Sequence, residues 1–177
     1  MATATQQKCT ICHLKPKSHC FMKISTHPIN IYYSSIPRSS DFSNATAIQH
    51  HIVSTLEPNR DWIWIFDCKG LSSKHAVQID VVKYLIKLMM DDKYAKCMMR
   101  FVAINMSATA SKLLEMVMPF LPKEARDNID KYSSSPIEII GGLQKFGLNA
   151  ETLKWINKAV VLDVEEDLPE ITGSATH

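Results

Sequence analysis

Residues 62–71 read Trp62-Ile-Trp-Ile-Phe-Asp-Cys-Lys-Gly-Leu71. The first five are all apolar, and each is β-branched or aromatic, which is typical of a strand with both faces covered. Gly70 is placed to end this strand in a turn. A second run of similar character, Arg100-Phe-Val-Ala-Ile-Asn105, predicts a second buried strand further along the chain.

Segments of helical periodicity alternate with these strands. Ser43 is expected to cap a helix that Pro58 stops, and apolar periodicity predicts a long helix from about 75 to 92. A further helix is expected to open at Ser111, and Asn149 is placed to cap the last one. This order predicts an α/β domain with a mixed, mostly parallel β-sheet flanked by helices.

Three segments divide the chain. Residues 1–28 are predicted to be an irregular arm containing Cys and Lys, residues 29–162 a single domain, and residues 163–177 an acidic tail. The run Ile29-Asn-Ile-Tyr-Tyr33 is expected to open the domain as a short strand. The run Val160-Val-Leu162 is expected either to add a closing strand or to pack on the core.

The composition is that of one globular domain. The chain has 177 residues, of which 46% are hydrophobic and 21% charged. Its formal net charge of +2 is too small to indicate nucleic acid as a partner. No apolar run is long enough to span a bilayer, and no leader sequence is expected. We therefore expect an intracellular protein, cytoplasmic or organellar (mitochondria included), that is soluble or peripheral to a membrane.

The arm carries the sequence Cys9-Thr-Ile-Cys12-His13. Read literally, this is the C-x-x-C-H pattern of haem attachment. With His19 and Cys20 nearby, the same stretch also offers four ligands of the kind that bind zinc. The simpler interpretation is a mobile arm with free cysteines, because there is one pair only and its partners follow within a tight loop. The sequence therefore predicts no metal and no cofactor.

The sequence contains no recognisable catalytic machinery. It lacks a G-x-S-x-G elbow, an H-E-x-x-H pair and a phosphate-binding loop. His50 and His51 are neighbours on a predicted helix, so they point in different directions and do not converge on one metal. Asp67 ends the first strand, where α/β sheets often place active residues. Its expected role is to accept hydrogen bonds from backbone N–H groups in the turn at 68–71. We predict that the protein is not an enzyme.

Four landmarks occur in a characteristic order between Trp62 and Trp155. The first is the apolar strand that closes in Asp67-Cys-Lys-Gly-Leu71, and the second is the long helix after it. The third is the strand ending in Asn105, and the fourth is Met118-Pro-Phe-Leu-Pro122 before a short charged helix. In this order they resemble the CRAL-TRIO lipid-binding domain, the fold of phosphatidylinositol, tocopherol and retinaldehyde carriers.

The resemblance implies a sheet that forms the floor of an apolar cavity, covered by helices of which one is a mobile gate. The counterpart of this gate is expected within Ser135 to Phe146. Side chains of the strands and the gate would then line the cavity and bind lipid: Trp64, Phe66, Val102, Ile104, Ile139 and Leu143. Burying an acyl chain is favourable by about 0.8 kcal/mol per CH₂, so the site needs no catalytic group.

The chain also departs from the family pattern. The helical module that usually precedes the domain is replaced by the Cys/Lys arm, and the family's L-P-x-x-x-G-G ending has only a loose echo at 168–173. No residue matches the basic head-group contacts of the phosphoinositide carriers, so the identity of the lipid stays open.

Two hypotheses follow. In the first, the protein is a lipid carrier or sensor that contacts a membrane peripherally. In the second, it is an accessory subunit that reuses the fold as a scaffold and binds other subunits through its arm and tail.

Overall fold

A single five-stranded sheet forms the centre of the molecule. The computed structural model describes residues 9, 12, 14, 18–26 and 29–161. The strands lie in the order in which they occur in the chain: β1 (Phe21–Ser25), β2 (Asn30–Ser35), β3 (Trp62–Asp67), β4 (Met98–Ile104) and β5 (Ile129–Lys131). β1 runs antiparallel to β2, and every other pair is parallel. This confirms the predicted mixed, mostly parallel sheet.

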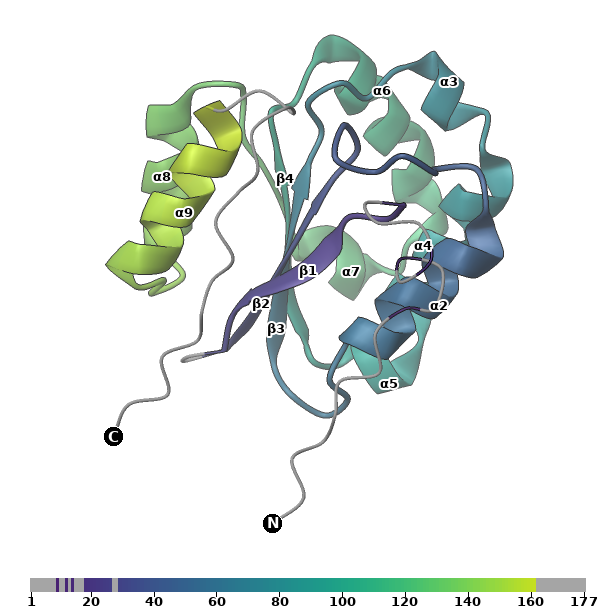
Figure 1. Cartoon of the computed structure of the whole chain (residues 1–177), viewed down its shortest axis with the longest axis horizontal. Coiled ribbons are helices and arrows are strands. Elements are labelled where there is room, and N and C mark those ends of the chain that lie inside the picture. The colour runs from purple at the N-terminus through teal and green to yellow at the C-terminus, as the bar shows by residue number, and fades with distance from the viewer. Residues whose placement is uncertain (1–8, 10–11, 13, 15–17, 27–28, 162–177) are drawn as a thin grey trace.

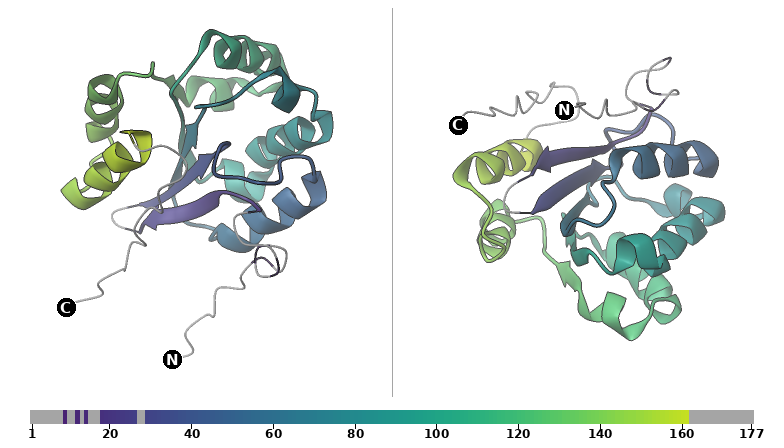
Figure 2. Two further views of the ribbon diagram at one scale, coloured as in Figure 1. Left: turned by 45° about the horizontal axis from the view of Figure 1, so that its top comes forward. Right: turned by 90° about the horizontal axis from the view of Figure 1, so that it is seen from below.

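The helices cover the two faces of the sheet unequally (Figure 1). The connections from β2 to β5 all advance in one direction, so their helices pack on one face: α2 (Ala45–Thr55), α3 (Ser73–Ala76), α4 (Ile79–Met90), α5 (Asp92–Ala95), α6 (Ala108–Val117), the 3-10 turn η1 (Met118–Phe120) and α7 (Lys123–Asp127). Of the described helices, α8 (Pro136–Gln144) and α9 (Ala150–Val161), which follow β5, cover the other face, as both views in Figure 2 show.

The strands bury side chains on both faces. Along β3, Trp62 and Trp64 pack toward the helices α2 and α4, whereas Ile63 and Ile65 pack toward α8 and α9. This alternation follows from the two-residue period of a strand. It explains why the β3 sequence is continuously apolar, since a parallel strand at the centre of the sheet has no face open to water.

The edge strand β1 lies in the segment that the sequence predicted to be irregular. Phe21 and Ile24 are buried, and the strand pairs with β2. Its register shifts between Lys23 and Ser25, which is an irregularity of the β-bulge type. A bulge breaks the alternation of buried and exposed side chains. The sequence pattern of a strand is therefore lost here, although the strand itself forms.

The predicted long helix is interrupted near its start. Ser72 and the side chain of His75 form a capping box that holds the short helix α3, and α4 begins only at Ile79. Val77, which one continuous helix over 75–92 would include, lies in the break and is 68% exposed. The local Ser–His hydrogen bonds therefore override the apolar periodicity at this point.

The other helix boundaries follow local capping. Asn44, rather than Ser43, caps α2 by accepting a hydrogen bond from the Ala47 amide, and Ser107, rather than Ser111, caps α6. Asn149 caps α9 as predicted, with its Oδ1 atom 2.7 Å from the amide of Thr152.

At the end of the domain, Val160 and Val161 belong to α9, so the alternative of a closing strand is wrong. Leu162 and the acidic tail lie outside the described residues. None of the helices in the described part of the chain is both long enough and apolar enough to cross a bilayer.

Candidate functional site

Four of the six predicted lining residues meet between the sheet and the helices α8 and α9. Val102 and Ile104 come from β4 and point to the same face because they are two residues apart. Ile139 and Leu143 are four residues apart on α8 and therefore share one side of that helix. All four are fully buried in one hydrophobic cluster. The helix that contributes two of them begins within the segment where the gate was expected.

Trp64 and Phe66 lie on the opposite face of the sheet. Trp64 is 1% exposed, and its indole N–H donates a hydrogen bond to Ser34 Oγ at 2.8 Å. Phe66 is half-buried and stacks edge-on against Trp64. Because successive side chains of a strand point to opposite faces, the six residues do not line a single cavity.

A small cavity lies on the Trp64 side of the sheet. Its volume is about 40 Å³, and its walls include Phe66 from β3, Ile52 from α2 and Leu85 from α4. Pockets for small molecules measure about 300–1,000 Å³, whereas one water molecule needs only about 10–15 Å³. The cavity has room for water but not for a lipid.

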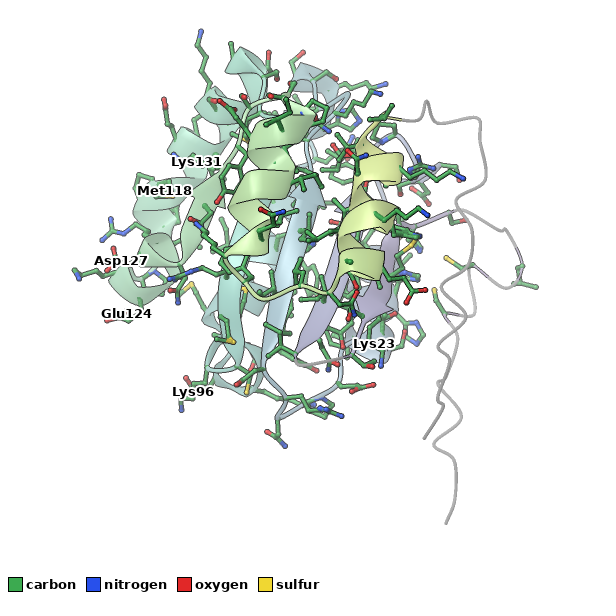
Figure 3. The ribbon with its side chains drawn as sticks, turned by 90° about the vertical axis from the view of Figure 1, so that its left-hand side faces the viewer. Lys23, Lys96, Met118, Glu124, Asp127 and Lys131 are labelled. Atoms are coloured by element: carbon green, nitrogen blue, oxygen red, sulfur yellow. The ribbon has the colours of Figure 1, made fainter. Side chains whose placement is uncertain are left out.

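The face beneath α8 and α9 is filled with side chains. Trp155 of α9 packs edge-to-face on Tyr33 of β2, with 5.2 Å between the ring centroids. Figure 3 views the molecule from this side, and the two helices lie in front of the strands, with Lys131 marking the β5 edge and Lys23 the β1 edge. In this conformation the α8–α9 hairpin covers the sheet face, and Val102 and Ile104 beneath it are 0% exposed.

A groove of about 570 Å³ lies on the outer side of the same two helices. Its walls include Ile137 and Ile140 from α8 and Leu153 from α9. Ile137 is 85% exposed, which is high for so apolar a side chain. The hairpin therefore presents apolar side chains to the surroundings as well as to the sheet.

Asp67 is the centre of a buried hydrogen-bond network at the carboxyl ends of the central strands. Its side chain is almost fully buried. The Tyr33 hydroxyl donates to Oδ2 at 2.7 Å, and Oδ1 accepts from the Asn105 amide at 2.8 Å and from the Lys69 backbone N–H at 2.9 Å. Burial, and then the charge of Asp67, raise the pKa of Tyr33, so its hydroxyl stays a donor. The predicted turn-stabilising role is confirmed at Lys69, and both carboxylate oxygens are engaged within the protein.

The cysteine motif of the arm packs against α2. Cys9 and Cys12 lie beside His19 and His51, the latter a residue of α2. Cys20 is separate from them and packs at the edge of the cluster beneath α8 and α9; His13 lies outside the described residues. His51 was missed because it is 39 residues from Cys12, so no local spacing connects the two.

The adjacent glycines of α8 give a test of how the hairpin is seated. Gly141 has open space where a Cβ would lie, whereas a Cβ on Gly142 would overlap the Tyr132 ring, which precedes the hairpin. We expect Gly141→Ala to stabilise the protein by about 0.5–1 kcal/mol through helix propensity and reduced freedom of the unfolded chain. We expect Gly142→Ala to destabilise it by about 1 kcal/mol or more through overpacking. Chemical denaturation of the two variants measures both signs.

The control for this pair is the Tyr132→Ala background, which removes the overlapping ring. There, Gly142→Ala should become as favourable as Gly141→Ala. Equal effects of the two alanines in the natural background would show that Tyr132 does not seat the helix.

Comparison with known proteins finds a matching domain family and similar solved structures. The model of the CRAL/TRIO domain family matches residues 5–146. The solved structures that match include the crystal structure of Sfh5, with a TM-score of 0.52 and 12% sequence identity. The match covers 66% of this chain and 49% of that one, so the chain spans about half the length of Sfh5. At this identity the likeness shows a shared fold. No curated protein matches the sequence.

Proposed function

Because the chain belongs to the CRAL-TRIO family, whose domains bind lipids and other small hydrophobic ligands, we propose that it binds a lipid without catalysing a reaction. The family match over most of the chain is the observation that carries this proposal. The engaged state of Asp67 supports a non-catalytic role, since both oxygens of this buried carboxylate already accept hydrogen bonds.

We place the ligand between the sheet and the α8–α9 hairpin. The sheet face there is lined by Val102 and Ile104, which meet Ile139 and Leu143 of α8. An acyl chain of about sixteen carbons gains on the order of 10 kcal/mol when it leaves water, which can offset the contacts that an opening hairpin gives up. The two aromatic residues Trp64 and Phe66 then support the sheet from behind rather than touch the ligand.

Ligand entry requires the hairpin to move, because side chains fill the space between it and the sheet and leave Val102 and Ile104 0% exposed. In this proposal α8 and α9 move away from the sheet as one unit, hinged at the segment 133–135. The exposed Ile137 and the outer groove suit contact with a membrane surface, where a lipid exchanges without crossing water.

The test is native mass spectrometry of the purified protein, followed by organic extraction and lipid identification. A stoichiometric lipid mass would support the proposal and name the ligand class. A protein that carries no lipid, and takes none up from vesicles of mixed phospholipids, would contradict it.

Substitution of one side chain on each face locates the ligand. Ile104→Trp adds bulk beneath the hairpin and is expected to abolish lipid uptake, whereas Leu85→Trp adds bulk beside the cavity on the other face and should leave it unchanged. Circular dichroism and thermal unfolding confirm that each variant is folded. Normal uptake by a folded Ile104→Trp protein would remove Ile104 from the binding site.

The filled interior favours a second candidate function, that of an accessory subunit. A scaffold keeps its core packed with side chains, and both faces of this sheet are packed in that way. Protein without lipid that co-purifies stoichiometrically with other subunits from its natural source would favour this function over lipid binding.

A further inference from the structure

Three side chains of the N-terminal arm converge with a distant one from α2. Cys9 and Cys12 come from the arm, His19 precedes β1, and His51 lies on α2; one ligand atom from each lies within 4.8 Å of the others. The sulfur of Cys12 is 3.5 Å from Nδ1 of His19 and 3.5 Å from Nδ1 of His51, and the sulfur of Cys9 is 4.0 Å from Nδ1 of His19.

These distances match the edges of a tetrahedral zinc site. Zinc binds sulfur at about 2.3 Å and imidazole nitrogen at about 2.0–2.1 Å, so two such ligands at the tetrahedral angle lie about 3.6 Å apart. The two separations from Cys12 agree with this value to within about 0.1 Å. The separation from Cys9 exceeds it by about 0.4 Å, which a side-chain rotation can correct.

The orientation of His51 fits metal binding through Nδ1. Its Nε2 atom lies 2.9 Å from the backbone carbonyl oxygen of Phe21. A carbonyl only accepts, so Nε2 carries the proton and Nδ1 directs its lone pair toward Cys12. Metal-binding histidines are usually held in this way, with the second ring nitrogen donating to a carbonyl or carboxylate.

The surroundings of His19 point to the same conclusion. Its side chain is buried, and its Nε2 atom has no hydrogen-bond partner among the residues that the structure describes. The polar neighbours of its Nδ1 atom are the two cysteine sulfurs, which are weak hydrogen-bond partners. An ion bound at Nδ1 would replace these two weak partners with a strong one, which lowers the cost of burying the imidazole.

Zinc binds cysteine as the thiolate and histidine as the neutral imidazole, so metal binding at this site would release the two thiol protons.

We propose that Cys9, Cys12, His19 and His51 bind one zinc ion in a closed tetrahedral site that fastens the arm to α2. Two thiolates and two imidazoles form a ligand set that zinc prefers, and four protein ligands leave no position open for a substrate, so the site is structural. The arm is also held by the Ser18 carbonyl oxygen, which accepts from the Asp41 N–H at 2.9 Å and from Ser39 Oγ at 2.8 Å. The site is independent of the proposed lipid function.

The first experiment measures metal content in the full chain, prepared under reducing conditions without a histidine tag. We expect about one equivalent of zinc by elemental analysis. After exchange with Co²⁺, we expect the visible bands of tetrahedral cobalt and a thiolate-to-cobalt charge-transfer band. Reduced protein that binds neither ion, or a cobalt spectrum without the thiolate band, would overturn the proposal.

Matched variants test the ligand set. Cys12→Ser and His51→Ala should reduce bound zinc to less than about a tenth of an equivalent. Cys20→Ser and His50→Ala, which change a cysteine of the same arm and the exposed neighbour of His51, should retain all of it. Circular dichroism shows which variants are folded. If a variant does not fold, the metal content and cobalt spectrum of the unaltered chain still test the proposal. Zinc retained by a folded His51→Ala protein would overturn the assignment.

Discussion

Replacing Asp67 with alanine is expected to lower the free energy of unfolding by about 4 kcal/mol. The change leaves the Tyr33 hydroxyl and the Asn105 amide buried without their acceptor, at about 1–3 kcal/mol for each unpaired group. A domain of this size is stable by about 5–15 kcal/mol, so the loss is a large part of the total. Urea unfolding followed by tryptophan fluorescence measures it.

The control for this substitution is Asp80→Ala. The Asp80 side chain is 87% exposed, and its oxygen is 4.0 Å from Lys83 Nζ, so its removal should change stability by less than about 0.5 kcal/mol. A double-mutant cycle with Tyr33→Phe then separates the contribution of the tyrosine from that of Asn105. A loss below about 1 kcal/mol for Asp67→Ala would show that the network does not depend on its carboxylate.

The central strands could be predicted from the sequence because their apolar composition indicates that both of their faces are buried. Trp62–Asp67 begins with five consecutive apolar residues and Met98–Ile104 ends with four, a pattern typical of a strand that is covered on both faces. The edge strands were missed for opposite reasons. β1 contains a bulge that hides its period, and β5 is only three residues long, so its pairing with β4 holds it in place more than its own pattern does.

The candidate site was predicted only in part. Trp64 and Phe66 face one side of the sheet, and Val102 and Ile104 face the other. This separation depends on the register that places Trp64 beside Phe101, and one sequence does not supply that register. The same limit applies to His51, which joins Cys9 and Cys12 only because β1 brings the arm to α2.

The two faces of the sheet have different parts to play in the proposed function. The face toward α2 and α4 is supported by all the helices that connect the parallel strands, so it cannot open without disrupting the fold. Among the described elements, the other face is covered by the α8–α9 hairpin, which follows β5 through the segment 132–135. If the hairpin is a gate, it must open at a lower free energy than the rest of the domain unfolds.

Trp155→Ala is therefore expected to loosen the hairpin selectively. Trp155 is 7% exposed and packs on Tyr33, and removal of a buried tryptophan side chain costs about 3–5 kcal/mol. Since a factor of ten corresponds to about 1.4 kcal/mol, amide exchange in α8 and α9 should accelerate about 100-fold or more, while β3 and β4 keep their protection as long as the rest of the domain stays folded. Hydrogen exchange with mass spectrometry resolves the elements.

The matched control is Trp62→Ala, which removes a tryptophan of similar burial from the other face, where its indole N–H donates to the Tyr94 carbonyl at 3.0 Å. This substitution should accelerate amide exchange in the strands and the hairpin alike, because it destabilises the central sheet, on which all the helices pack. If Trp155→Ala gives the same uniform acceleration, the hairpin unfolds only with the whole domain. It would then be a fixed layer rather than a gate, and the accessory-subunit hypothesis would gain over lipid binding.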